Sequence, residues 1–564
     1  MNPRSHFQPL LVLALVLSLQ LVSNPNVVSA NSVHVAPGAN SPSIPNYQWQ
    51  FLSPSEKAAV DASLKVIMNE RFKNITLNIQ EDAGAPYTGK LQVTQTSTGF
   101  INWAGYSPRE ANWTYFLATN PSRSYDVHVP WDQVEPIRGE WNFSTPGRLY
   151  TPDWEYADGI HHNMTDFHLF LGPAVGICCY WIPDWAKALE KSVQSNNSAD
   201  YDSLKSAMRE YVEAVVSHFK GRISQYELWW EPNAWYGNDY WPLDRIIDII
   251  KMEATTIRAV DPAARICIDL VRMTDDAIQY ENGQTHNNWT TEDFVQQLLA
   301  VGVQFDVIGL EPHIGTGWPE SAGDISTLYN SLIELARFGK TLYVWEDGLE
   351  SYLPPDWLAK AKQGPAWRGT WHGTPSEEKQ AEYMVAETLV YLGNPSVIGL
   401  RWNKLSDTVP WSGNLDDDGL MTAWNGTAKK SFYALQALWN SLMVNETVQS
   451  VNGVVTFRGL AGNYSISAEG YELEPSSVYV SEGKQNTFSL VLKSTTRTTT
   501  SITSTTPTTS GTVTANRTVA APQLIENPLL ISAGALCIAI VLAAIILKRR
   551  KSPFQKRECV SQES

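Results

Sequence analysis

The chain has few basic residues for its length. Its 564 residues include 42 Lys and Arg against 58 Asp and Glu, which gives a formal net charge of −16. Nucleic-acid binding generally needs a basic surface that neutralises phosphates. The charge balance therefore excludes a general nucleic-acid binder, and no nucleic-acid partner is expected.

Cysteine is also scarce, with five residues in the chain, two of them near the C-terminus. The other three, Cys178, Cys179 and Cys267, are too few for a disulfide framework and lack metal-ligand spacing. We expect them to be buried strand residues, although a disulfide between the adjacent Cys178 and Cys179 stays open. The acidic run Asp416–Asp418 lacks the spacing of a calcium loop, and no metal or cofactor is expected.

Long apolar runs are confined to the two ends. Near the N-terminus, Arg4 precedes the apolar run Leu10–Val22 and the small residues Val28–Ala30. This pattern predicts a cleaved secretory signal peptide. The alternative is an uncleaved anchor, for which the run is short.

The C-terminal run Leu529–Leu547 contains no charge, and a helix of this length spans about 28 Å, close to a bilayer core. The basic residues Lys548–Lys551 follow directly, which places the tail in the cytoplasm. The sequence therefore predicts a single-pass protein of the cell membrane with its body outside the cell.

A Ser/Thr-rich segment before the apolar run is typical of a glycosylated stalk. Glycan acceptors of the form Asn-X-Ser/Thr are frequent, as expected for an exported chain. They occur at Asn74, Asn112, Asn142, Asn163, Asn196, Asn288, Asn425, Asn445, Asn463 and Asn516. Tryptophan is abundant, with 22 residues. Many will be core residues, but the excess favours a carbohydrate site, where indole rings stack on sugars.

Two segments, Tyr226–Asn233 and Lys340–Gly348, each resemble a strand that stops at a glutamate and is followed by a turn. Neither Glu231 nor Glu346 has a basic neighbour in sequence. Cleavage of a glycosidic bond needs one carboxyl that stays protonated and one that stays ionised. The pair therefore indicates a glycosidase, whereas either glutamate alone is also compatible with a buried structural role.

Strands alternate with helices through the middle of the chain, which predicts a (β/α)8 TIM barrel of the α/β class. The expected strands are Phe100–Gly105, Tyr125–Pro130, Phe167–Gly176, Tyr226–Trp230, Arg265–Leu270, Phe305–Leu310, Leu342–Trp345 and Val397–Trp402. The expected helices are Asp202–Phe219, Pro242–Val260, Thr291–Val301, Ile325–Phe338 and Ser376–Leu392. In this fold Glu231 follows the fourth strand and Glu346 follows the seventh, where active sites lie.

The predicted boundaries are a signal peptide at 1–30, a β-rich lead-in at 31–98, the barrel at 99–445, an accessory β segment at 446–493, a stalk at 494–527, a transmembrane helix at 528–547 and a cytoplasmic tail at 548–564. The two β-rich segments form a small accessory β domain, either together or separately. The sequence leaves that choice open.

Short motifs in a shared order resemble glycoside hydrolase clan A, and most of all its family 10, over roughly residues 70–490. They are Thr76–Ile79, Lys90–Gln95 and Gly99-Phe100, then Val129-Pro130, Val134–Pro136 and Gly139, then Gly176–Trp181 and Pro183–Trp185, then Phe305–His313, and finally Gly419-Leu420, Lys429–Leu435 and Thr456–Tyr464. The resemblance implies that Glu231 is the general acid/base and Glu346 the nucleophile. It also implies that His313 orients Glu346, and that Trp402 and Trp411 are platforms at the cleavage site.

The chain departs from the family pattern beside the cleavage site. Trp230 stands where the family has an asparagine before the acid/base. Trp131, Asp132 and Val134 replace a Glu-Asn pair and a lysine, and Ile177 replaces a histidine. Trp131 and Trp230 are therefore expected to bind substrate through their rings, and we expect glucan to be preferred over xylan.

The sequence thus predicts a cell-surface retaining β-glycoside hydrolase that makes internal cuts in a β-1,4-linked polysaccharide, as an endo-β-glucanase or related endo-glycanase. Its expected partners are a polysaccharide or oligosaccharide and the membrane. Two alternatives remain: a non-catalytic carbohydrate-binding surface protein on a barrel scaffold, and a transglycosylase that remodels glycans.

Overall fold

The structure is a computed structural model of the 564-residue chain. It describes residues 47–104, 113–144, 151–172, 182–193, 198–228, 231–233, 241–271, 289–312, 324–353, 371–407, 418–422, 426–483 and 485–495. The predicted signal peptide, transmembrane helix and tail lie outside these residues, as does nearly all of the predicted stalk. Within the described ranges, no helix has both the length and the apolarity needed to cross a membrane.

Eight parallel strands form the central sheet. They are β3 (Ile101–Ala104), β4 (Ser124–Pro130), β5 (Asp166–Gly172), β6 (Gln225–Glu227), β7 (Arg265–Val271), β8 (Val307–Glu311), β9 (Thr341–Asp347) and β10 (Val397–Trp402). Their order is β3-β10-β9-β8-β7-β6-β5-β4, and the first and last members of this row contact each other. Each strand is thus beside its sequence neighbours, and the ring closes between β3 and β4. This is the strand order of a (β/α)8 barrel, so the predicted barrel and its eight strands are confirmed.

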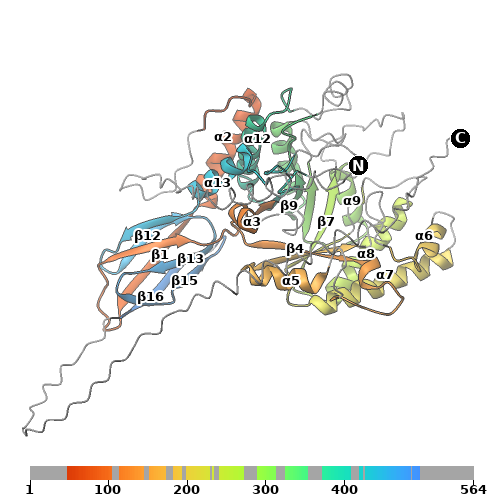
Figure 1. Ribbon diagram of the computed structural model, residues 1–564, viewed down its shortest axis with the longest axis horizontal. Coiled ribbons are helices and arrows are strands. Elements are labelled where there is room, and N and C mark those ends of the chain that lie inside the picture. Colours follow the sequence, from red (N-terminus) through yellow and green to blue (C-terminus); the bar gives the residue numbers. More distant parts are fainter. Residues whose placement is uncertain are drawn as a thin grey trace, which may run out of the picture. The chain divides into compact units, whose positions relative to one another are not determined.

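Helices follow the strands along the chain, and several surround the barrel strands in Figure 1. They are α3 (Trp113–Thr119), α4 (Trp131–Val134), α5 (Pro152–His161), α6 (Lys187–Val193), α7 (Ser198–Phe219), α8 (Leu243–Val260), α9 (Thr291–Ala300), α10 (Ile325–Ala336), α12 (Glu377–Leu392) and α13 (Lys430–Leu442). The side chains of Thr290, Asp324 and Ser376 each accept a hydrogen bond from a backbone N–H in the first turn of α9, α10 and α12. Such caps satisfy backbone donors that have no partner within the helix, and they explain where three of the predicted helices begin.

An earlier helix, α2 (Pro54–Val66), continues into the π-turn Ile67–Arg71 and packs against α10 and α12. Ser53 caps α2, and the side chain of Glu56 accepts a hydrogen bond from the backbone N–H of Ser53. Glu56 also accepts hydrogen bonds from the side chains of Trp371 at 2.8 Å and His372 at 2.6 Å. Glu56 thus also fixes the helix to the segment that precedes α12.

The two β-rich segments combine into one sandwich. One sheet has the order β12-β1-β16-β14 and the other β11-β2-β13-β15. The strands are β1 (Lys73–Glu81), β2 (Lys90–Gln95), β11 (Asn445–Gln449), β12 (Val454–Gly459), β13 (Gly462–Ser467), β14 (Tyr471–Glu474), β15 (Ser477–Val480) and β16 (Asn486–Ser494). Alternate residues from both sheets, among them Leu77, Val93 and Leu490, form a shared core. The question left open by the sequence is therefore answered: the segments before and after the barrel form one β domain.

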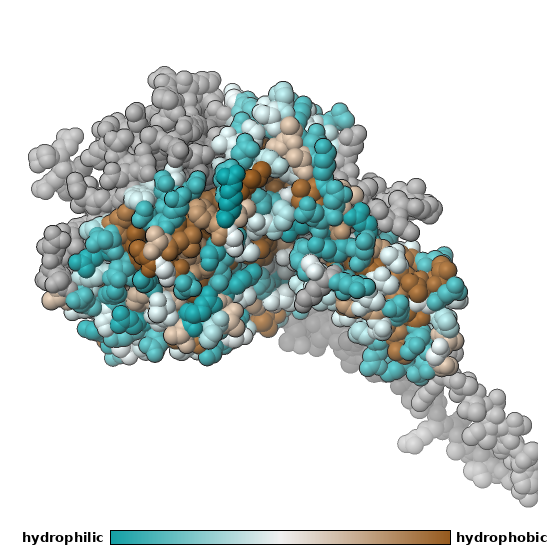
Figure 2. Space-filling view, turned by 180° about the vertical axis from the view of Figure 1, so that it is seen from behind, coloured by the Kyte–Doolittle hydropathy of each residue, from teal (hydrophilic) through white to brown (hydrophobic). Residues whose placement is uncertain are grey.

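Hydrophilic residues cover most of the described surface on the face seen in Figure 2, and the hydrophobic residues there form separate patches. Large exposed apolar side chains include Ile137 and Trp154 in the barrel part and Val451 and Tyr479 in the sandwich. Scattered exposed apolar residues are normal on folded proteins. They give no reason to assign an apolar partner.

Candidate active site

Glu346 lies at the end of β9, where its side chain is 5% exposed. Its Oε1 accepts a hydrogen bond from Nη2 of Arg401 at 2.9 Å, and Nη1 of Arg401 donates to Asp126 Oδ2 at 2.8 Å. Arg401 is on β10 and Asp126 is on β4, two strands that are not neighbours in the sheet. Their contact therefore crosses the inside of the barrel, and Arg401 joins two carboxylates there.

The guanidinium of Arg401 is held rigidly. Its side chain is fully buried, its Nε donates to the backbone oxygen of Trp345 at 2.7 Å, and its central carbon lies 4.2 Å from the centre of the Trp345 ring. A planar guanidinium that donates in several directions and stacks on an indole has little freedom to move. Arg401 is thus a fixed positive charge against Glu346.

Burial dominates the ionisation of Glu346 and raises its pKa to about 7. The positive charges of Arg401 and Lys404 act in the opposite direction, and the negative charge of Asp418 adds to the rise in pKa. A carboxyl with a pKa near neutrality is ionised in a large fraction of molecules at pH 7 and above. Glu346 can therefore serve as a nucleophile in that pH range.

Glu231 lies in the turn that follows β6, and it is partly buried. Its backbone φ is 46°, in the left-handed region that non-glycine residues rarely adopt. Such strain persists only where the surroundings fix it, and it is frequent at functional sites. A specific interaction must therefore hold this turn.

Asn233 holds the turn. It is fully buried, and its Nδ2 donates to the backbone oxygens of Val271 at 2.5 Å and Trp289 at 3.3 Å. Its Oδ1 accepts from the backbone N–H of Val271 at 3.1 Å. The residue two places after Glu231 is thus joined to the end of β7, the next strand of the barrel. This contact positions Glu231 at the carboxyl end of the strands.

Further carboxyls line the interior near Glu231. The pKa of Asp269 is raised well above its usual value by burial, by the charge of Glu311 and of Glu227, and also by Glu231. The pKa of Glu227 is likewise raised well above its usual value, chiefly by burial, while Arg401 opposes the rise. The interior beside Glu231 therefore contains further buried carboxyl groups whose pKa values are raised, chiefly by burial.

The other predicted site residues are only partly described. Trp131 is fully buried, its ring contacts those of Trp185 and Tyr211, and its Nε1 donates to Glu135 at 2.6 Å. Trp402, at the end of β10, is fully buried too. Trp230, His313 and Trp411 lie outside the described residues. Substrate binding by these five residues stays a prediction.

Three residues of the site were missed in the sequence: Arg401, Asp126 and Asn233. Arg401 interrupts the otherwise apolar strand β10, and Asp126 is a charged residue of the fully buried strand β4. These charges were the available signal, because a charge inside a barrel strand needs a partner. The expectation that Glu346 has no basic neighbour holds along the chain, but Arg401 reaches it from 55 positions away. Asn233 gave no signal beyond its place in the turn.

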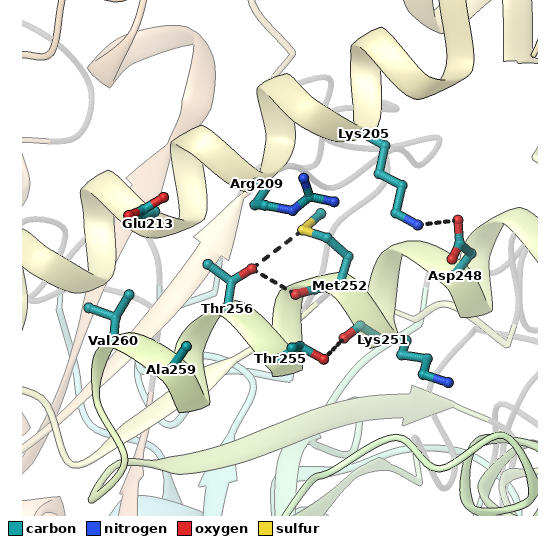
Figure 3. Close-up of a pocket in the computed structure, with 10 residues that line it drawn as sticks. All are labelled: Lys205, Arg209, Glu213, Asp248, Lys251, Met252, Thr255, Thr256, Ala259 and Val260. Carbon is teal, nitrogen blue, oxygen red and sulfur yellow. Dashed lines mark hydrogen bonds and ion pairs between the residues drawn. The ribbon is translucent and has the colours of Figure 1, made fainter. Parts of the chain in front are cut away.

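One surface groove lies away from the two glutamates. It has a volume of about 440 Å³ and is lined by residues of α7 and α8. In Figure 3 its polar side chains mostly contact one another or the helix backbone, as Lys205 with Asp248 at 2.6 Å and Thr256 with the backbone of Met252 at 2.8 Å. None of the predicted site residues lines it. Within the described ranges, no group of three or more His, Cys, Asp and Glu residues is arranged to hold a metal ion.

Comparison with known proteins identifies the family. The model of glycosyl hydrolase family 10 matches residues 130–438, which is more than half of the chain. The chain belongs to glycosyl hydrolase family 10. The resemblance found in the sequence motifs is thereby confirmed.

Two curated relatives are similar over about half of this chain. Endo-1,4-beta-xylanase 1 of Humicola insolens is 20% identical over 303 residues, which cover 50% of this chain and 62% of the relative. Endo-1,4-beta-xylanase A of Phanerodontia chrysosporium is 23% identical over 286 residues, which cover 49% of this chain and 60% of the relative. The chain thus spans only about three fifths of the length of these relatives. A solved family 10 structure from Paenibacillus barcinonensis is 15% identical, with a TM-score of 0.42 and coverage of 61% of this chain and 96% of that chain.

Proposed function

We propose that this family 10 protein is a retaining endo-glycoside hydrolase of β-1,4-linked polysaccharide, with Glu346 as the nucleophile and Glu231 as the general acid/base. The observation that carries the proposal is the buried Glu346 carboxyl, held by Arg401 at the end of a barrel strand. The names of the two relatives, both endo-1,4-beta-xylanases, support the β-1,4 linkage and internal cleavage.

In the first step the Glu346 carboxylate attacks the anomeric carbon of the sugar. The bond between that carbon and the leaving oxygen breaks, and Glu231 gives its proton to the leaving oxygen. A glycosyl ester on Glu346 results, with Glu231 ionised. Arg401 donates to Oε1 of Glu346, so the carboxylate is held in a fixed direction before it attacks.

In the second step Glu231 takes a proton from water, and the resulting hydroxide attacks the anomeric carbon. The ester bond breaks, Glu346 leaves as a carboxylate, and Glu231 is protonated again. Two inversions give net retention of the β configuration.

The same proposal places the enzyme at the cell surface. Its support is the uncharged run Leu529–Leu547 followed by Lys548–Lys551, together with the N-terminal signal pattern. Protease added to intact cells should release an active fragment by cutting in the Ser/Thr-rich segment. A full-length protein that stays with the soluble fraction after lysis would contradict this location.

The activity is tested on the full-length protein purified in detergent. Soluble xylan, mixed β-glucan and cello-oligosaccharides are supplied, new reducing ends are counted, and the first anomer formed is followed by NMR. We expect new reducing ends and an initial excess of the β anomer. Glu346→Gln should lower kcat by several orders of magnitude while the protein stays folded. The matched control is Glu378→Gln, the same change at an exposed carboxyl of α12, which should leave kcat unchanged.

The alternatives give different results in the same assay. Binding of glycans without new reducing ends would indicate a non-catalytic surface protein. Products longer than the substrate would indicate a transglycosylase. An initial excess of the α anomer would contradict the double displacement.

A further inference from the structure

A line of paired side chains runs along the inside of the barrel, from the amino ends of the strands to Glu346. Asp166, the first residue of β5, contacts His168, with Oδ2 and Nε2 3.1 Å apart. His168 Nδ1 lies 3.7 Å from Asp126 Oδ1, and Asp126 Oδ2 accepts a hydrogen bond from Arg401 Nη1 at 2.8 Å. The line ends where Arg401 Nη2 donates to Glu346 Oε1 at 2.9 Å. From His168 onward every side chain in it is fully or almost fully buried.

The strand register places Asp126 in this line. Asp126 and His168 are each the third residue of their strand, β4 and β5, and they are direct partners in the sheet. Asp166 lies two positions before His168, so both point to the same side of β5. Asp166 also accepts hydrogen bonds from the hydroxyls of Ser124 at 3.2 Å and Ser224 at 2.5 Å. These contacts join the strand that carries Asp126 to its neighbours.

Asp126 and Glu346 divide the positive charge of Arg401 between them. Each carboxylate accepts from a different arm of the same guanidinium. Burial acts against the charged form of Arg401, but the charges of Asp126 and Glu346 oppose that effect and raise its pKa above the usual value. Other ionisable groups also act on the three: Lys404 and Asp418 on Glu346, Tyr343 and Glu227 on Arg401, and His168, Glu227 and Cys267 on Asp126.

We propose that Asp126 is a positioning residue that acts on the nucleophile Glu346 through Arg401. It fixes one arm of the planar guanidinium, so the other arm is aimed at Oε1 of Glu346. It also takes up part of the positive charge, so the Glu346 carboxylate is not fully neutralised by its partner. The inference rests on the proposed role of Glu346, and it adds a residue that lies deeper in the barrel than the reacting groups.

The test follows the first chemical step alone. The full-length protein in detergent is mixed with 2,4-dinitrophenyl β-cellobioside or β-xylobioside, and the first-turnover burst of dinitrophenolate is measured across pH. This leaving group needs no proton from Glu231. The acid limb, which is the fall in burst rate at low pH, therefore reports the protonation of Glu346. Wild type should show this limb near pH 7, because burial raises the pKa of Glu346 to about 7.

Three variants of Asp126 separate its charge from its hydrogen bond. Asp126→Asn removes the charge but keeps an oxygen that accepts from Arg401. Its acid limb should move to lower pH by about one unit, because an anion near Glu346 is gone, and its burst rate above the limb should stay within about threefold of wild type. Asp126→Ala removes charge and acceptor, so its acid limb should also move down. Its burst rate should fall about ten- to a hundredfold with the substrate Kd nearly unchanged, because the guanidinium is no longer aimed.

Asp126→Glu keeps the charge but changes the shape of the side chain. Its acid limb should stay at the wild-type pH even if the burst rate falls, whereas a change in packing that lets water reach Glu346 would move the limb in this variant too. The matched control is Asp61→Asn, the same amide substitution at an exposed aspartate of α2, which should behave as wild type. Urea unfolding shows which variants are folded.

An acid limb in Asp126→Asn at or above the wild-type pH, or an equal downward shift in Asp126→Glu, would overturn the role of the charge. Equal burst rates in folded Asp126→Asn and Asp126→Ala would overturn the aiming of Arg401. If Asp126→Asn does not fold, the acid limb of Asp126→Ala against that of Asp126→Glu decides. These outcomes leave the proposed function intact, because wild type still releases dinitrophenolate. If wild type releases none from either glycoside, the nucleophile assignment fails and this inference fails with it.

Discussion

Arg401 and Glu346 form an ion pair inside the barrel, with Nη2 and Oε1 2.9 Å apart and both side chains almost entirely buried. Arg401 also pairs with Asp126, so it compensates two buried carboxylates. Taking ions out of water is costly unless each is paired and hydrogen-bonded. The pair therefore serves both the fold and the ionisation of the proposed nucleophile.

Removal of the positive charge of Arg401 should both lower the free energy of unfolding and shift the pH dependence of kcat/KM. Arg401→Met leaves Glu346 and Asp126 without their partner, and breaking a buried pair in this way typically costs about 3–5 kcal/mol of unfolding free energy. In the variant that remains folded, the acid limb of kcat/KM should move to higher pH, because a cation that lowers the pKa of Glu346 is gone. Urea unfolding and pH–rate profiles measure the two effects. The matched control is Arg337→Met, because the side chain of Arg337 is 71% exposed. The role of Arg401 would be contradicted if both variants showed the same unfolding free energy and the same acid limb.

The pH dependence of the wild-type enzyme follows from Glu346. Burial raises its pKa to about 7, and only the ionised carboxylate can attack the sugar. As pH falls through 7 the carboxylate is protonated, so kcat/KM should fall about tenfold for each further pH unit. The profile of kcat/KM on an aryl glycoside measures this limb directly. An acid limb near pH 4.5 would show that Glu346 is solvated or is not the nucleophile.

Much of the fold was predictable because it depends on local patterns. All eight barrel strands and the five predicted helices appear near their expected bounds, since apolar runs, amphipathic spacing and capping residues such as Ser376 act over a few positions. The joining of the two β-rich segments was not predictable. It depends on pairing between strands such as β1 and β12, which lie on either side of the barrel in sequence, and strand alternation carries no information on the partner.

The site divided in the same way. Glu231 and Glu346 were predicted because each follows an apolar strand pattern and precedes a turn, and a parallel barrel gathers strand ends at one face. Arg401 was missed because its partners, Asp126 and Glu346, are far away in sequence. Its position within the apolar stretch Leu400–Trp402 was the only local sign.

The turn that carries Glu231 should depend on Asn233. Asn233→Ala removes three hydrogen bonds to Val271 and Trp289 and leaves buried backbone groups without partners, which costs roughly 1–3 kcal/mol for each group. A displaced Glu231 donates its proton poorly, so substrates with poor leaving groups should lose far more kcat than dinitrophenyl glycosides. The ratio of the two kcat values is the measurement. The control is Asn78→Ala, at an exposed asparagine of β1, which should leave this ratio as in wild type. An unchanged ratio in Asn233→Ala would refute the positioning of Glu231 by Asn233.

Export through the secretory pathway should leave glycans on exposed acceptors. Asn142 and Asn163 are both exposed in the structure, so the amide nitrogen of each is accessible for transfer of a glycan. Full-length protein from eukaryotic cells should migrate faster in gels after treatment with an N-glycosidase, and Asn142→Gln and Asn163→Gln should each remove part of that shift. Asn78→Gln, at an exposed asparagine outside any acceptor motif, is the control. No shift in the wild-type protein would contradict the proposed export.

Substrate preference should follow from the polar groups that this chain lacks. A hydrogen bond to the sugar 2-hydroxyl strengthens in the transition state and supplies several kcal/mol in this chemistry, but Trp230 stands where family 10 resemblance places an asparagine. An indole has one N–H to donate and no group to accept with. Val134, where a lysine is expected, is fully buried and offers no polar contact. A site that relies on stacking should tolerate the hydroxymethyl group of a hexose, so kcat/KM should be higher for β-glucan and cello-oligosaccharides than for xylan. Trp230→Asn should shift the ratio of the two kcat/KM values towards xylan. If the wild-type kcat/KM on xylan is instead well above that on glucan, another residue must supply the missing amide contact.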